Sequence, residues 1–122
     1  MENTQTSYLV AGAAGNLGHR IIDALVRTRP ASDIRAGVRG GSAGKHANRA
    51  RGWIANGVTV VNMDLDDPLS LKHACAGVGT VVSAVQGGPD TIIDGQSRLL
   101  EAAFAADVGR FVPSDFSETI LA

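Results

Sequence analysis

Short apolar runs of strand length alternate along the chain with longer segments of helical periodicity. The expected strands are residues 7–12, 33–39, 58–63, 79–85 and 110–113, and the expected helices are residues 16–28, 45–56, 68–76 and 91–107. Several runs are nearly continuous in valine, as in VTVVNM and GTVVSAV, which is typical of strands covered on both faces. Strict alternation implies right-handed crossovers. The sequence therefore predicts an α/β fold: a doubly wound parallel sheet of about five strands in the order 3-2-1-4-5.

Length and composition suit one domain over residues 1–122. With 44% hydrophobic but only 4% aromatic residues, the core must be aliphatic, and the last expected helix presents a broad apolar face to it. A net charge of −1 gives no case for binding nucleic acid or an anionic membrane. No apolar run approaches the ~20 residues that span a bilayer. The polar start MENTQTS and the lone Cys75 favour a protein of the reducing cytoplasm.

Three glycines follow the first strand and open the first helix, in the stretch VAGAAGNLGHR. This is the context of a Rossmann-type dinucleotide-binding loop. Gly12 would permit the tight turn, Gly15 the approach of backbone to a pyrophosphate, and Gly18 close packing of the helix. The first-turn amides around Asn16 and Leu17 would face the phosphates. The alternative is chance, since 15 glycines in 122 residues can produce this G-x-x-G-x-x-G spacing by accident.

The end of the second expected strand discriminates NAD from NADP, because an acid there binds the ribose 2′-hydroxyl and an arginine accepts the 2′-phosphate. Here the strand ends at Arg39, and no Asp or Glu occurs from Ile34 to Met63. The same window holds further basic residues: Arg35, Lys45, Arg49 and Arg51. A guanidinium binds a phosphate through paired hydrogen bonds, and a lysine adds a point charge. The pattern favours NADP, with a solvated helix face as the alternative reading for Arg49 and Arg51.

The segments GAAGNLG, AGVR, MDLDDPLSLKHACAGV, TVVSAV and RFVPSDF resemble the N-terminal half of the atypical short-chain dehydrogenase/reductase superfamily, among them the NmrA-like and isoflavone-reductase-like proteins. The resemblance implies the NADP(H)-binding domain of an oxidoreductase that reduces a small organic substrate. It also implies where the cofactor would bind. The phosphate loop would be Gly12, Ala14, Gly15, Asn16, Leu17 and Gly18; the 2′-phosphate would meet Arg39 and Lys45; the adenine would meet Asp64 and Leu65; the ribose would meet Ser83, Ala84 and Val85; and the nicotinamide end would meet Pro113, Ser114 and Phe116.

The chain departs from hydride-transferring relatives in lacking a Tyr-x-x-x-Lys pair, since its only tyrosine is Tyr8 and its only lysines are Lys45 and Lys72. No catalytic residue is assigned. The resemblance therefore predicts the N-terminal part of a longer protein, inactive by itself. The fifth strand would be left as a sheet edge, which invites homo-oligomers.

Two other functions stay open. One is a non-catalytic regulatory protein that senses NADP, and the other is a nucleotide-sugar epimerase relative with bound NAD, which Arg39 disfavours. The substrate is not inferred. A metal site is not expected, because His46 and His73 lack companion ligands at metal spacing. The acids at 64, 66 and 67 are expected to form a turn and a helix N-cap.

Overall fold

A five-stranded parallel sheet forms the centre of the structure, a computed structural model that describes residues 7–44, 46–85 and 89–113. Its strands run in the order β3-β2-β1-β4-β5, and every neighbouring pair is parallel. This confirms the predicted doubly wound order. The strands are β1 (Tyr8–Ala11), β2 (Ile34–Val38), β3 (Thr59–Asn62), β4 (Thr80–Ser83) and β5 (Arg110–Val112).

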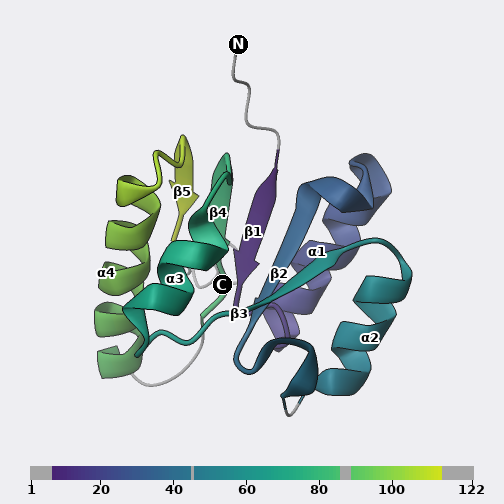
Figure 1. Ribbon diagram of the computed structural model, residues 1–122, viewed down its shortest axis with the longest axis horizontal. Helices are drawn as coiled ribbons and strands as arrows, with labels where there is room; N and C mark the ends of the chain where they lie inside the picture. The colour runs from purple at the N-terminus through teal and green to yellow at the C-terminus, as the bar shows by residue number, and fades with distance from the viewer. Residues whose placement is uncertain (1–6, 45, 86–88, 114–122) are drawn as a thin grey trace, which may run out of the picture.

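Helices cover both faces of the sheet, with α1 and α2 on one side and α3 and α4 on the other (Figure 1). The helices are α1 (Asn16–Thr28), α2 (Ala47–Ala55), α3 (Pro68–Cys75) and α4 (Pro89–Ala105), with short 3-10 turns η1 (Ala31–Asp33) and η2 (Gly41–Ala43). All four helices were expected at these places. The crossover from β3 through α3 changes the side of the sheet, so the carboxyl ends of β1 and β4 meet at the topological switch point.

Two aliphatic cores, one on each face, hold the layers together. Neighbouring residues of β1 point to opposite faces, and both Leu9 and Val10 are fully buried. Leu9 packs with α3 and α4 residues such as Leu71 and Leu99. Val10 packs with Ile22 of α1 and the single tryptophan, which belongs to α2. Burial on both faces explains why the strands read as continuous apolar runs.

Helix α4 buries a narrower face than its sequence predicts. Leu99 and Ala103 are buried, but Ile93, Leu100 and Phe104 are 64%, 50% and 84% exposed. Their periodicity is helical, yet only the stripe turned toward α3 and the sheet is covered within the described part of the chain. Helix α4 lies near β5, which is the edge of the sheet (Figure 1).

Candidate cofactor-binding site

The glycine loop leaves β1 at the switch point and is tied to the end of β2. The N–H groups of Gly12 and Ala13 both donate to the carbonyl of Gly37, each at 3.1 Å. Gly12 has a φ of +76°, and a Cβ at that position would lie 2.8 Å from the carbonyl oxygen of Ala84. Both the conformation and the space therefore require glycine, which confirms the tight turn predicted for Gly12.

Helix α1 begins without a side-chain cap. Its N-cap is Gly15, no side chain accepts a hydrogen bond there, and its first turn contains no acid. The first-turn amides, including those of Asn16 and Leu17, are thus available to an anion. Gly18 permits a close approach, as predicted, but to the loop itself: a Cβ there would collide with the carbonyl oxygen of Gly12 and lie 2.7 Å from Cα of Ala13.

A cavity of about 190 Å³ opens over this loop. It brings together the loop, the end of β2, the start of α2 and the end of β4. Its lining residues are Gly12, Ala14, Gly15, Gly37, Val38, Arg39, His46 and Ala84. Three of the six predicted phosphate-loop residues, Gly12, Ala14 and Gly15, therefore share one cavity with Arg39, whereas Asn16, Leu17 and Gly18 do not line it. A larger cavity of about 640 Å³ lies between α3 and α4, and none of these residues lines it.

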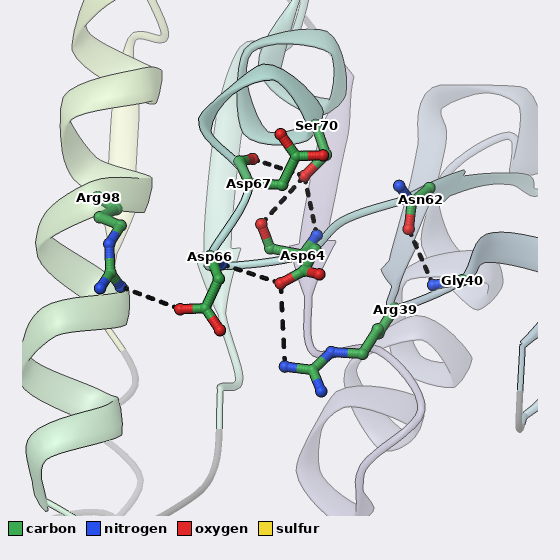
Figure 2. A network of polar contacts seen from close by, with 8 residues as sticks. All are labelled: Arg39, Gly40, Asn62, Asp64, Asp66, Asp67, Ser70 and Arg98. Carbon is green, nitrogen blue, oxygen red and sulfur yellow. Dashed lines mark hydrogen bonds and ion pairs between the residues drawn. The ribbon is translucent and has the colours of Figure 1, made fainter.

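Arg39 projects from the carboxyl end of β2 toward the turn that follows β3 (Figure 2). Its side chain is 75% exposed, and Nη2 lies 3.9 Å from Oδ1 of Asp64. The next residue, Gly40, has a φ of +81° and donates its N–H to Oδ1 of Asn62 at 2.8 Å. The turn is fixed by this bond, whereas the guanidinium keeps most of its surface open to solvent.

The turn after β3 is held by its own polar groups, as predicted for the acids at 64, 66 and 67. Oδ1 of Asp64 accepts from the N–H of Asp66 at 2.9 Å, and Asp67 caps α3 by accepting from the N–H of Leu69 at 3.1 Å. Ser70 Oγ accepts from the N–H of Asp64 at 2.9 Å and lies within donating distance of the carbonyls of Asp64 and Asp67 (Figure 2). Asp64 thus sits beside Arg39 on a rigid turn.

Leu65 takes a different position from the one that the resemblance implied. Its side chain packs into the core beneath α4, where a Cβ added to Gly95 would lie 2.7 Å from Cδ1 of Leu65. It does not line the cavity. A contact between Leu65 and adenine stays a prediction.

The basic residues from β2 to the start of β3 have different roles. Arg35 does not face the cavity: its Nη1 donates to the carbonyls of Ala74 and Ala76, at 2.7 and 2.9 Å, and so caps the C-terminal end of α3. Arg51 bonds locally to Asn48, as a solvated helix face would. Lys45 lies outside the described residues.

Arg49 is a residue whose role the sequence did not reveal. Its Nη1 donates to the carbonyl of Ala14 in the glycine loop at 2.7 Å. The reading of a solvated helix face is therefore incomplete for Arg49: its side chain is exposed, but its guanidinium also bonds to the glycine loop. A pattern of charges does not predict where a long side chain points. Helical spacing alone could therefore not have shown that Arg49 contacts the loop and Arg51 does not.

His46 is a second residue that the sequence did not place in the site. The sequence suggests only a metal ligand without companions, but His46 immediately precedes α2 and lines the cavity with Arg39. Its position at the start of the helix that follows the Arg39 turn is the sequence signal that could have indicated a place in the site. No cluster of potential metal ligands occurs among the described residues, and none of the helices described is long and apolar enough to cross a bilayer.

The end of β4 contributes one residue to the cavity rather than three. Ala84 lines it and donates its N–H to the carbonyl of Ala11 at 2.8 Å. Val85 is 6% exposed and packs in the core on the α3 and α4 side of the sheet. Ser83 is 0% exposed and faces the same side, because it lies two residues after Val81 of that core on β4. Ser83 Oγ is buried without a hydrogen-bond partner. This geometry does not support ribose contacts through these two side chains, because neither lines the cavity.

The expected nicotinamide end is only partly described. Pro113 follows β5 and is exposed. Ser114 and Phe116 lie outside the described residues. Their roles stay predictions.

The sequence profile of the NmrA-like family matches residues 4–120. The chain belongs to this family. It is 35% identical over 120 residues to an isoflavone reductase homolog of Zea mays, a match that covers 95% of this chain and 37% of the relative.

Two solved structures of similar fold are oxidoreductases. Triphenylmethane reductase of Citrobacter sp., complexed with NADP(H), shows 32% identity and a TM-score of 0.74 over 86% of this chain and 36% of its own. The NADPH-dependent quinone oxidoreductase of Escherichia coli, complexed with NADPH, shows 31% identity and a TM-score of 0.74 over 85% of this chain and 35% of its own. This NmrA-like chain thus spans about a third of the length of the relatives that it matches.

Proposed function

We propose that this NmrA-like chain is the NADP(H)-binding domain of an isoflavone-reductase-like oxidoreductase that reduces a small organic substrate. One observation carries the proposal: Arg39 and the glycine loop line the same cavity. A dinucleotide whose pyrophosphate lies on the loop would bring its adenosine 2′-phosphate to the end of β2, where Arg39 projects. NADP(H) would supply the hydride, and similar reductases are crystallised with this cofactor.

The residues present fit such a cofactor. Gly12 lets the loop pass close to the Ala84 carbonyl, and the uncapped first turn of α1 offers amides to the pyrophosphate. Arg39 and Lys45 would hold the 2′-phosphate, and His46 lines the cavity with Arg39. The cavity of about 190 Å³ is smaller than the ~300–1,000 Å³ of a complete small-molecule site, so it suits only the phosphate portion. Asp64 and Pro113, with the predicted nicotinamide contacts of Ser114 and Phe116, would extend the site along the strand ends.

Titration of the wild-type chain with NADPH and NADH, by cofactor fluorescence and calorimetry, tests the assignment. We expect tighter binding of NADPH. Equal affinities would contradict the role of Arg39, and absence of binding would contradict the cofactor site altogether.

The chain by itself is proposed to be catalytically inactive. Tyr8 is the first residue of β1, at the amino end of the sheet, and the guanidinium of Arg29 lies 4.8 Å from its ring centroid. Lys72 lines the cavity between α3 and α4. Neither is placed to work at the carboxyl edge. NADPH oxidation with quinones and triphenylmethane dyes should therefore show no turnover with this chain.

A regulatory NADP sensor is the second candidate, because the two acid-base groups of the described site, Asp64 and His46, lie near Arg39 at the expected 2′-phosphate end rather than at the nicotinamide end. Activity of the full-length protein separates the two functions. NADPH oxidation that depends on substrate supports the reductase, whereas tight NADPH binding without turnover supports the sensor.

We also propose that the chain associates through the β5 edge. β5 is the last strand on its side of the described sheet, and Ile93, Leu100 and Phe104 of the neighbouring helix α4 are exposed. An open strand edge next to an apolar surface favours association. Light scattering over a concentration series should reveal dimers or larger assemblies, and a monodisperse monomer would contradict this proposal.

A cytoplasmic location is likewise a proposal. It rests on the single thiol of Cys75, which is buried and free. A reducing compartment suits an unpaired cysteine. Localisation of the full-length protein in its own cell tests it.

A further inference from the structure

The contact between Arg49 and Ala14 joins two parts of the site that are far apart in sequence. Arg49 lies in α2, and its Nη1 donates to the Ala14 carbonyl at 2.7 Å. Ala14 belongs to the loop and lines the cavity. The bond is charge-assisted and therefore stronger than a neutral one.

The loop has few other attachments. Backbone bonds tie its start to Gly37, and the N–H of Gly15 turns back to the carbonyl of Gly12 at 3.2 Å. The side chain of His19 contacts the carbonyl of Gly15, but from within α1. In the described part of the chain, Arg49 is the side chain that holds the loop from outside the loop and α1.

Position along α2 separates Arg49 from the groups that would meet the 2′-phosphate. His46 precedes the helix and lines the cavity with Arg39. Arg49 lies almost one turn further on and reaches the stretch of loop that leads directly into α1. The pyrophosphate expected there is common to NADP(H) and NAD(H).

We propose that Arg49 is a positioning residue: it holds Ala14 so that the first-turn amides of α1 face the cofactor pyrophosphate. This rests on the proposed function. Because the contact is to the loop, Arg49 serves both dinucleotides equally, whereas Arg39 distinguishes them.

The test compares Arg49→Ala, Arg49→Lys, Arg39→Ala and Arg51→Ala, each titrated with NADPH and with NADH. Arg49→Ala should weaken both cofactors by the same factor, about three- to tenfold, as expected for one exposed charge-assisted bond. Arg49→Lys should retain part of the affinity. Arg51→Ala is the matched control, because Arg51 belongs to the same helix and bonds only locally to Asn48; it should leave both affinities unchanged.

A selective loss of NADPH affinity in Arg49→Ala would overturn the proposal, since Arg49 would then contact the 2′-phosphate itself. Unchanged affinity for both cofactors would also overturn it.

A second measurement needs no cofactor. Amide hydrogen exchange over residues 12–18 should be faster in Arg49→Ala than in Arg51→Ala, with equal exchange in the strands. If the wild type binds neither cofactor, the proposed function fails, and this comparison still decides whether Arg49 holds the loop. Equal exchange over residues 12–18 in the two variants would overturn the proposal.

Discussion

Nη2 of Arg39 lies 3.9 Å from Oδ1 of Asp64, across the carboxyl ends of the neighbouring strands β2 and β3. The side chains are 75% and 36% exposed, so solvent screens the pair and its contribution to stability is at most about 1 kcal/mol. Such a weak pair leaves the guanidinium free to exchange its partner. A phosphate placed beside Arg39 would therefore compete with Asp64 and be repelled by its charge.

Asp64→Asn should raise the affinity for NADPH by about two- to fivefold, the size expected from a screened charge pair. The amide oxygen can still accept from the N–H of Asp66, which bonds to Oδ1 of Asp64 at 2.9 Å in the wild type, so the turn is preserved. NADH affinity should hardly change. Weaker NADPH binding would mean that Asp64 instead orients Arg39 productively.

Arg39→Ala should weaken NADPH binding by about 1.5–3 kcal/mol, the value of a hydrogen bond to a charged group. NADH lacks the 2′-phosphate and should bind with unchanged affinity. Calorimetric titration of both cofactors measures the difference directly. Equal losses for the two cofactors would place Arg39 at the pyrophosphate instead.

The sequence predicts the backbone of this site better than its side chains. Strand order and the roles of Gly12 and Gly18 follow from β-α alternation and from spacing, because a parallel sheet brings the ends of β1, β2 and β4 together. The assignments of Arg35 and Arg49 could not be made this way. A long side chain can extend along several directions, and only the packed positions of α2 and α3 decide which carbonyl it reaches.

Sequence patterns also fail to predict the side-chain surroundings on the outer face of α4 and at the end of β4. Helical periodicity predicts that Leu100 and Phe104 belong to an apolar face of α4, but it does not show what covers that face. Both side chains are exposed. For Ser83, strand alternation places it with Val81 on the α4 side, away from the cavity. The resemblance alone could not show this, because it supplies positions along the chain rather than side-chain directions.

Replacing glycine by alanine should lower the stability of the fold at Gly12 and raise it at Gly52. Gly12→Ala should destabilise the fold by more than the ~1–2 kcal/mol of a left-handed conformation, because its Cβ would also press on the Ala84 carbonyl at 2.8 Å. Gly52→Ala is the matched control: Gly52 lies inside α2 with nothing within 4 Å of a Cβ, so alanine should stabilise by about 0.5–1 kcal/mol. Urea unfolding measures both. Stability losses of the same size would show that the loop is not tightly packed.

Cys75 should make the stability depend on alkaline pH. Burial raises the pKa of its thiol from 9.0 to about 11, partly offset by the charge of Arg35. A raised pKa favours the folded state fully below pH 9, and this contribution declines as the pH rises from 9 toward 11. The free energy of unfolding should therefore fall over that range in the wild type and fall less in Cys75→Ala. Identical pH profiles would contradict the raised pKa.

Ser83→Ala tests whether the side chain at the end of β4 serves the cofactor or only occupies the core. Ser83 Oγ is buried without a hydrogen-bond partner, and a buried, unpaired hydroxyl costs about 1–3 kcal/mol in proteins. Removing it leaves a small side chain in an aliphatic surrounding, so the variant should unfold at higher urea concentration. NADPH affinity should be unchanged, because Ala84, not Ser83, lines the cavity. A stable variant with weaker binding would show that the hydroxyl turns toward the ribose when cofactor is bound, and a destabilised variant would show that it has a partner in the native protein.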